Sequence, residues 1–383
     1  MKLSILTATY NRANYLPKLY ESIKENLKYK ITPEWIIVDD GSTDETKNIV
    51  EEFIKENRII IKYMYQKNSG KMSAINEAVK IATGDLIVDC DSDDFFSDNG
   101  FEIIEKNAEK LFKDEELYGM VFLKKEENGK ISGKEFSQKE YKTTMFDLYF
   151  KEDINGEKII VYNSKVRKMY SHQLKHNEKF ITEARMYHKM DEKYKILAIN
   201  EVVEIGSYIE DGYTKNINKT FKENPYGYYM YFKELLKKNM KGVKFSKRLY
   251  AIKHYILFGY LTNSKFDDSF IKDIFNKFLY IILYLPGIIK SKKFWWKGRS
   301  NMLTEILAFL GAMIVLFIIL KIISLPIKLI IKLLINALIG GIVLFLINLT
   351  GIIVIDITWI SALIVGFLGI PGVIIVILLH FLL

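Results

Sequence analysis

An acidic cluster early in the chain has the composition of a divalent-cation site. Asp91-Ser92-Asp93-Asp94 comes shortly after the apolar run Leu86–Val88. Two carboxylates spaced two residues apart at the end of a strand can hold a cation, and hard oxygen ligands suit Mg²⁺ or Mn²⁺. A cation held there can neutralise the charge that builds up on a departing diphosphate. Asp and Ser before a helix are also ordinary N-cap residues, so the cluster alone predicts either a metal site or a helix cap.

A second acidic cluster, Asp39-Asp40-Gly41-Ser42, has the same two interpretations. The Asp40 carboxylate can accept the ring N–H of a uracil, whereas Ser42 or its neighbour can simply cap the next helix. Lys71 follows a short Asn-Ser-Gly segment. Its ammonium group either faces a phosphate or is a solvated charge at the start of a helix.

The elements that must position these residues alternate along the first 110 residues. Short apolar runs predict strands, and apolar residues that recur every three or four positions predict helices. The predicted strands are Lys2–Thr7, Trp35–Val38, Ile59–Tyr65 and Asp85–Asp89, and the predicted helices are Asn14–Lys28, Thr43–Glu56 and Lys71–Ala82. Such alternation indicates βαβ units and a parallel sheet with helices on both faces. Ligands bind such sheets at the carboxyl ends of the strands, where the polar clusters fall.

Composition divides the 383-residue chain into a charged front and an apolar tail. The net charge is +9, yet residues 303–383 contain only five charged side chains. The single cysteine, Cys90, excludes a disulfide scaffold and a Cys-based zinc site. The first apolar stretch breaks at Asn11-Arg12, so we expect no signal peptide and a cytoplasmic front. Because the basic residues are mixed with acidic ones, we expect attraction to anionic lipid and no nucleic-acid partner.

The tail contains three apolar runs, Ile306–Leu320, Leu333–Ile355 and Ile357–Leu383. The first two are predicted as membrane helices, and the first can only just cross when it is extended to Ile323. The third includes Pro371-Gly372, so it is predicted as either a kinked span or a re-entrant hairpin. Basic and aromatic residues near 290–299 are typical of a cytoplasmic membrane interface.

Taken together, the polar clusters resemble those of the family 2 glycosyltransferases of the GT-A fold. The resemblance is close over residues 1–100. It is carried by these segments: Ile5-Leu6-Thr7-Ala8-Thr9-Tyr10-Asn11-Arg12, Val38-Asp39-Asp40-Gly41-Ser42-Thr43-Asp44, Asn68-Ser69-Gly70-Lys71, Ala78 through Gly84-Asp85, and Asp91-Ser92-Asp93-Asp94. It implies an α/β, Rossmann-like GT-A domain that binds a nucleotide-diphospho-sugar.

The same resemblance implies roles for individual residues. It assigns donor contacts to Thr7, Ala8, Thr9, Arg12, Asp40, Lys71, Asp91, Ser92 and Asp93. Within this set, Asp91 and Asp93 are expected to bind Mg²⁺ or Mn²⁺. The family's catalytic base usually follows the acidic cluster by some 90 residues, at the start of a helix. The segment lacks the family's common Glu-Asp pair, so two glutamates are candidates for that base. Glu183 is our preferred candidate, because it lies just before a helix with periodic apolar residues, and Glu178 is the second.

The tail resembles a different family, the BofA-type inhibitors of pro-sigma-K processing, which are small membrane proteins. The resemblance covers about residues 303–383 and is carried by Asn336–Gly341, Leu346–Gly351 and Gly366–Gly372. It implies a partnership with an intramembrane metalloprotease. Asn348 in this tail is predicted either to reach into that protease or to hydrogen-bond a neighbouring helix. A natural fusion and two merged reading frames both fit the junction near Met302.

These observations predict three parts: a GT-A domain over 1–225, a helical and partly interfacial extension over 226–302, and a transmembrane tail over 303–383. The expected function is that of a metal-dependent, inverting glycosyltransferase of the cell membrane, with its catalytic domain in the cytoplasm. It would move a sugar from a UDP-sugar to a glycan or lipid-linked acceptor in polysaccharide synthesis. The alternative is a regulatory membrane protein whose sugar-transferase domain only binds. A nucleotidyltransferase fits less well, because Thr7–Arg12 lacks the glycines of a phosphate-binding loop.

Overall fold

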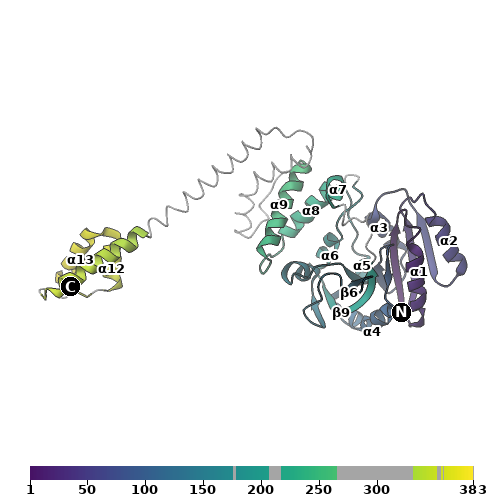
Figure 1. The fold of residues 1–383 in the computed structure, drawn as a ribbon, viewed down its shortest axis with the longest axis horizontal. Coiled ribbons are helices and arrows are strands. Elements are labelled where there is room, and N and C mark those ends of the chain that lie inside the picture. The colour runs from purple at the N-terminus through teal and green to yellow at the C-terminus, as the bar shows by residue number, and fades with distance from the viewer. Residues whose placement is uncertain (176–177, 207–216, 265–330, 352–354, 357, 383) are drawn as a thin grey trace. The chain divides into compact units, whose positions relative to one another are not determined.

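The computed structural model describes residues 1–382 except 176–177, 207–216, 265–330, 352–354 and 357 (Figure 1). The described residues divide between two compact units that separate at residues 295 and 296. The first unit is an α/β domain with a helical extension, and the second is a small set of apolar helices.

A mixed sheet forms the centre of the first unit. Its hydrogen-bonded order over the described residues is β3-β2-β1-β4-β8-β6-β9-β5, and β7 pairs with β9. The strands are β1 (Lys2–Thr9), β2 (Thr32–Asp39), β3 (Ile60–Tyr65), β4 (Leu86–Asp89), β5 (Asp94–Phe96), β6 (Leu117–Glu126), β7 (Glu140–Thr143), β8 (Lys158–Asn163) and β9 (Lys195–Gly206). The first four are parallel, whereas β8 is antiparallel to both β4 and β6.

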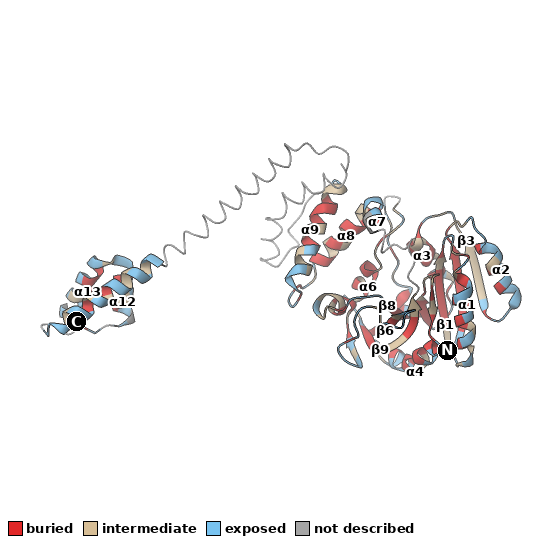
Figure 2. Cartoon of the chain, in the orientation of Figure 1, coloured by how far each residue is buried: buried red, intermediate tan, exposed pale blue. Residues whose placement is uncertain are grey.

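Helices cover both faces of this sheet because successive strand residues point to opposite sides. On β1, Ile5 packs in the core beneath α1 (Leu16–Glu25), α2 (Thr46–Glu56) and α4 (Gly100–Lys113). Leu6 packs in the other core with α3 (Lys71–Ile81), α5 (Ser164–Arg167) and α6 (Ala184–Met190). Figure 2 shows the buried strands between these helices.

A helical extension follows the sheet. It comprises α7 (Ile217–Glu223), α8 (Pro225–Leu236) and α9 (Phe245–Leu261). Helices α8 and α9 share an aromatic core in which Tyr229 stacks on Tyr255 and Phe232 on Phe258. Short helical turns at Asn26–Lys28 and Asp147–Lys151 complete the unit.

The second unit contains the helix Ile331–Leu349, α12 (Trp359–Leu368) and α13 (Ile370–Leu382). Within the described part of the chain, Ile331–Leu349 is the one helix long and apolar enough to cross a membrane, with a mean hydropathy of 2.1. Close helix packing depends on glycine, because a Cβ on Gly340 would lie 1.5 Å from Val365 Cγ1. Large apolar side chains such as Leu338 and Phe367 are each 66% exposed, which suits a lipid environment better than water.

The structure agrees closely with the four strands and three helices predicted up to residue 89, but β5 and α4, which follow them, were not predicted. The expected parallel arrangement is correct for β1 to β4, but the complete sheet is mixed. The sheet is mixed because β8 pairs antiparallel with β4 and β6. An antiparallel neighbour does not require the crossover helix that a parallel neighbour requires. In the tail, Gly369 has a φ of +65° and separates α12 from α13. At about 1.5 Å per residue, neither helix alone reaches the roughly 30 Å of a bilayer core.

Candidate active site

The carboxyl ends of β1, β2 and β4 meet at one edge of the sheet, as their parallel pairing requires. Thr9 lies opposite Asp39 in the register of β1 and β2. The chain remains paired just beyond the strands, because Asp40 N donates to Thr9 O (2.8 Å) and Cys90 N donates to Leu6 O (2.9 Å). The two acidic clusters are therefore brought to the same edge.

Asp40 holds the turn that leads into α3. Its carboxylate accepts hydrogen bonds from Gln66 Nε2 (2.6 Å), Ser69 N (2.7 Å) and Gly70 N (2.8 Å). An ionised carboxylate has about four acceptor positions, so one remains for a ligand. The adjacent Asp39 has a structural role, since it accepts from Ser42 N and from the Tyr63 hydroxyl (both 2.7 Å).

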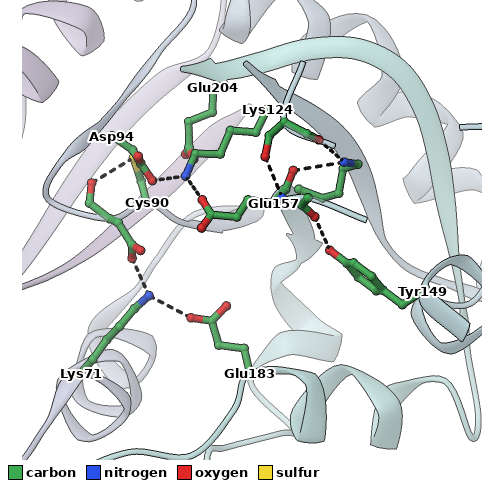
Figure 3. Close-up of polar contacts among 12 residues, drawn as sticks. Lys71, Cys90, Asp94, Lys124, Tyr149, Glu157, Glu183 and Glu204 are labelled. Carbon is green, nitrogen blue, oxygen red and sulfur yellow. Dashed lines mark hydrogen bonds and ion pairs between the residues drawn. The ribbon is translucent and has the colours of Figure 1, made fainter. Parts of the chain in front are cut away.

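Lys71 joins the acidic cluster to the candidate base (Figure 3). Its Nζ lies 2.6 Å from Asp91 Oδ1 and 2.9 Å from Glu183 Oε1. Lys71 is the first residue of α3, and Glu183 immediately precedes α6. The Glu183 carboxylate makes no capping hydrogen bond to its own helix. Two helix starts thus direct opposite charges at each other beside Asp91.

These ion pairs fix the charge states of the groups. Burial lowers the pKa of Lys71, but the charges of Asp91 and Glu183 outweigh it and raise that pKa well above its usual value. Burial likewise opposes ionisation of Asp91, yet Lys71 holds the pKa of this carboxyl below its usual value. Burial and the nearby charge of Asp91 raise the pKa of Asp93. Lys71 is therefore a permanent cation, and Asp91 is its permanent anionic partner.

Glu178 performs a different task from Glu183. Its carboxylate oxygens accept hydrogen bonds from Tyr226 N (2.6 Å) and Gly227 N (2.7 Å). Both amides lie in the first turn of α8, where N–H groups have no partner within the helix. Glu178 also lines a small hollow together with Ile181 and Arg185. The second candidate base therefore anchors the helical extension.

The remaining predicted donor residues surround the ends of the strands. Thr7 is fully buried, donates to Cys90 O and accepts from Trp35 Nε1 (both 3.0 Å). Thr9 is buried, and its hydroxyl has no hydrogen-bond partner among the described residues. Arg12 stacks over the Tyr15 ring at 5.6 Å, and its charge partly offsets the rise that burial and Asp91 cause in the pKa of Asp93.

The last two predicted donor residues, Ala8 and Ser92, differ in exposure. Ala8 is half-buried and packs against the core beneath α3. Ser92 is buried and stands between Asp91 and Asp93 in the sequence. The predicted donor residues thus gather at one edge of the sheet, although the roles assigned to them stay predictions.

A buried charge cluster beneath the acidic turn was missed by the sequence analysis. Lys124 Nζ lies 2.5 Å from Asp94, 2.8 Å from Glu157 and 3.5 Å from Glu204 (Figure 3). The cause is sheet register, since Lys124 lies opposite Glu204 and Asp94 opposite Gly206. Burial, reinforced by the charge of Glu204, raises the pKa of Asp94 to about 9. One lysine within an apolar strand is the only signal in the sequence for this cluster.

A buried arginine lies at the other side of the acidic turn. The side chain of Arg167 is fully buried, and its Nη2 lies 3.5 Å from Asp89 Oδ2. Arg167 Nη1 donates to Tyr170 O (3.0 Å). Despite this cation, burial raises the pKa of Asp89. The Arg167–Asp89 pair places further buried charge near Lys71, whose charge also acts on Asp89.

The acidic cluster supplies too few protein ligands to complete a Mg²⁺ or Mn²⁺ site, so substrate phosphates would have to supply the remaining oxygen ligands. In the described part of the chain, no three His, Cys, Asp or Glu side chains converge into a complete metal site. The charge of Asp91 acts on Asp93 and raises its pKa, so the turn concentrates negative charge at these two carboxylates. A divalent cation would offset this excess of negative charge. Mg²⁺ commonly binds through one or two carboxylates plus substrate phosphates, so Asp91 and Asp93 fit that role.

In the tail, Asn348 binds the chain that follows its own helix. Its amide donates to Ile355 O (2.9 Å) and accepts from Ile355 N (2.8 Å). The partner is thus a loop backbone, and the predicted contact with a neighbouring helix is made instead by Asn336, which donates to Gly366 O (3.4 Å). The basic interface predicted near 290–299 and the run Ile306–Leu320 lie outside the described residues.

Two family models match separate parts of the chain. Residues 4–174 match glycosyl transferase family 2, and residues 311–382 match the SigmaK-factor processing regulatory protein BofA. Both resemblances predicted from the sequence are confirmed. The BofA match and the apolar helix Ile331–Leu349 together indicate that the chain associates with a membrane.

Curated relatives match the front of the chain. The uncharacterized glycosyltransferase MJ1057 of Methanocaldococcus jannaschii is 31% identical over 47% of this chain and 60% of its own length. The uncharacterized glycosyltransferase MG060 of Mycoplasma genitalium is 35% identical over 29% of this chain and 38% of its own length. The dolichyl-phosphate beta-glucosyltransferase ALG5A of Trichomonas vaginalis is 32% identical over 29% of this chain and 36% of its own length. The chain therefore spans between about a third and three fifths of these relatives.

Solved structures overlap the chain loosely. Staphylococcus aureus TarS 1-349 in complex with UDP-GlcNAc aligns with a TM-score of 0.48 at 19% identity, over 76% of this chain and 81% of that chain. The mannosyltransferase PcManGT of Pyrobaculum calidifontis, in complex with GDP-Man and Mn²⁺, aligns with a TM-score of 0.40 at 15% identity, over 82% and 80%. Residues 4–174 thus match the family 2 glycosyltransferases and have the expected α/β fold, and residues 311–382 match the BofA family.

Proposed function

We propose that this protein is a membrane-attached, inverting glycosyltransferase. It moves a sugar from a nucleotide-diphospho-sugar to a hydroxyl of a glycan or lipid-linked acceptor, in the synthesis of cell-envelope polysaccharide. The observation that carries the proposal is the position of Lys71 between Asp91 and Glu183, 2.6 and 2.9 Å away. A cation for a diphosphate and a carboxylate for a hydroxyl proton are the two groups that this reaction requires.

The proposed step is a single displacement at the anomeric carbon. The acceptor oxygen forms a bond to that carbon while the bond to the diphosphate oxygen breaks. The bonding electron pair leaves with the nucleoside diphosphate, and the hydroxyl proton moves to the Glu183 carboxylate. Because attack comes from the face opposite the leaving group, the configuration at this carbon inverts. Lys71 stabilises the charge on the leaving diphosphate as a fixed cation.

For the donor we propose a UDP-sugar. Asp40 is buried at the strand edge and has one acceptor position left after binding Gln66, Ser69 and Gly70. A uracil ring N–H is a donor that suits this position. The backbone at Thr7–Thr9 lies beside Asp40, since Asp40 N donates to Thr9 O.

For the metal we propose Mg²⁺ or Mn²⁺ on Asp91 and Asp93. When bound, the cation would neutralise diphosphate charge. Lys124 forms an ion pair with Asp94. The amide of Asp94 donates to Asp91 O (3.0 Å) and closes the turn that carries both proposed metal ligands. Lys124 therefore helps to hold this turn in place.

A second candidate function rests on the tail. The BofA match over 311–382 supports a regulatory role in which this part of the chain restrains an intramembrane metalloprotease. The first unit would then be only a binding module. We favour the enzyme because Asp91, Lys71 and Glu183 are arranged for chemistry, which a module that only binds would not need.

The proposal is tested by Glu183→Gln, which keeps the shape of the side chain and removes its basicity. Loss of a general base typically costs about 10²- to 10⁴-fold in rate, and we expect this loss in transfer while UDP binding persists. Glu192→Gln is the matched control, because Glu192 is exposed just beyond the same helix. Transfer by Glu183→Gln at the rate of the control would show that Glu183 is not the base.

A further inference from the structure

The turn that joins α8 to α9 concentrates positive charge. Residues 237–248, here called the basic turn, contain six lysines and arginines and no acidic residue. Lys237, Lys241 and Lys244 are exposed. Over the helical extension, residues 217–264, ten lysines and arginines stand against two glutamates, whereas the whole chain has a net charge of +9. The extension therefore carries nearly all of the net positive charge of the chain.

Contacts with the α/β domain neutralise only part of this charge. Lys244 Nζ and Lys247 Nζ lie 2.7 and 2.6 Å from the carboxylate of Asp153. Lys134 Nζ lies 3.5 Å from the same carboxylate. Hydrogen bonds from Lys244 and Lys247 hold the pKa of Asp153 well below its usual value, so this carboxylate stays ionised. Three ammonium groups thus share one negative charge beside the exposed Lys241.

An aromatic side chain accompanies the lysines. Phe245 directly follows Lys244 and is 53% exposed. Lysines beside an exposed aromatic ring are typical of the membrane-water interface, where the ammonium groups stay with lipid phosphates and the ring enters the headgroup layer. The tail of the same chain associates with a membrane. A soluble anionic polymer would match the charge, but it would give no reason for the exposed ring.

The basic turn is fixed to the helix that begins at the proposed base. Lys238 Nζ donates to His188 O (2.8 Å) near the end of α6. Arg185 of α6 makes two hydrogen bonds to Glu234 of α8 (2.8 and 2.7 Å). Glu183 stands at the opposite end of α6, which at about 1.5 Å per residue is roughly 10 Å long. A surface bound at the basic turn would therefore lie about one short helix away from Glu183.

We propose that the basic turn docks on the anionic headgroups of a membrane and holds the acceptor side of the site near the lipid surface. The docking itself depends on charge, whereas its use, the presentation of Glu183 to a lipid-linked acceptor, rests on the proposed function. Each lysine near an anionic surface strengthens binding about fivefold. Salt weakens such binding, because it screens the charges.

The test measures how close the basic turn lies to lipid in nanodiscs that contain the full-length protein. The discs contain either phosphatidylcholine alone or equal parts of phosphatidylcholine and phosphatidylglycerol, with a trace of lipid whose headgroup bears a nitroxide quencher. Ser246→Cys carries a fluorophore, and Cys90 is buried, so the wild type treated with the same dye is the labelling blank. We expect strong quenching only with phosphatidylglycerol. We also expect its loss at about 1 M salt, where screening acts beyond about 3 Å.

A double variant removes the charge while leaving the helices intact. Lys241→Glu with Lys244→Gln changes the charge of the turn by three units, which should weaken docking about 100-fold at about fivefold per unit. Lys55→Glu with Lys47→Gln is the matched control, because both lysines are exposed on α2. The control should be quenched like the parent Ser246→Cys protein, and circular dichroism should show the same fold for both double variants.

Equal quenching in the two kinds of disc, or equal quenching of the two double variants, would overturn the docking. Docking would also be overturned if the label stays unquenched while a soluble phosphodiester polymer binds the parent protein and not the Lys241→Glu, Lys244→Gln variant. That result would assign the basic turn to a soluble polyanion. Nucleotide release from UDP-sugars is measured in the same discs. Release without docking contradicts this inference and leaves the proposed function standing, whereas docking without release from any donor contradicts the proposed function alone.

Discussion

Charge placement at single residues decides what this site can do. Lys71 remains protonated between two carboxylates, so it serves as a cation and not as a base. The carboxylate of Glu178 is occupied by two amides of α8, whereas that of Glu183 pairs with the side chain of Lys71. For this reason we propose Glu183, and not Glu178, as the base.

Asp93→Asn tests the metal assignment at the residue scale. The amide keeps the shape of the carboxylate but removes the charge that a hard cation requires, so we expect metal-dependent turnover to be lost while the fold survives. The measurements are turnover with Mg²⁺ or Mn²⁺ and circular dichroism. Asp98→Asn is the control, because Asp98 is exposed and lies four residues after Asp94, the last residue of the cluster. A near wild-type rate for Asp93→Asn would contradict the metal assignment.

The turn before α3 is the element on which the site depends. Gly70 has a φ of +95°, and its surroundings leave no room for a Cβ beside Lys179. Asp40 fixes the same turn through two backbone amides. The conformation of this turn therefore determines where Lys71 begins.

Gly70→Ala tests this element. The left-handed backbone should cost about 1–3 kcal/mol of unfolding free energy, and the clash with Lys179 should displace Lys71 and lower the transfer rate. Gly129→Ala is the matched control, because Gly129 has a φ of +90° and only the flexible end of Lys125 nearby, at 3.7 Å. We expect thermal melts to show a loss of stability in both variants, but activity assays to show a loss of transfer only in Gly70→Ala. Equal transfer by the two variants would contradict the role of the turn.

The sequence predicted β1 to β4 and α1 to α3 because each has a strong local pattern, whereas β5 and α4 were not predicted. Alternating βαβ units also require that Asp40 and Asp91 share one edge of the sheet. The Lys124 cluster was not predictable, because it depends on how β5, β6 and β9 align across more than a hundred residues. The contact between Lys71 and Glu183 was missed for the same reason, since neither residue's local pattern indicates the other.

At the scale of the whole molecule, one chain matches a glycosyltransferase family in its front part and the BofA family in its tail. A membrane anchor would keep the site near a lipid-linked acceptor, which fits the proposed function. The boundaries predicted at residues 225 and 302, and the side of the membrane that each part faces, stay predictions.

Membrane sidedness can be tested by cysteine labelling from outside intact cells. Basic residues before the first apolar run favour a cytoplasmic start for that run, by the positive-inside rule. They are Lys290, Lys292, Lys293, Lys297 and Arg299. We therefore expect a cysteine at position 328 to react, and cysteines at positions 356 and 130 not to react. Labelling at 130, or the reverse pattern at 328 and 356, would exclude this topology.

The central claim is that this chain transfers sugar from a nucleotide-diphospho-sugar by means of Glu183. The most direct test incubates the full-length protein in membranes with a panel of UDP-, GDP- and CDP-sugars and Mg²⁺ or Mn²⁺, and follows nucleotide release and product mass by mass spectrometry. We predict release of UDP and a product heavier by one sugar residue, both lost in Glu183→Gln. Absence of nucleotide release from every donor, or equal release by Glu183→Gln and the wild type, would contradict the account.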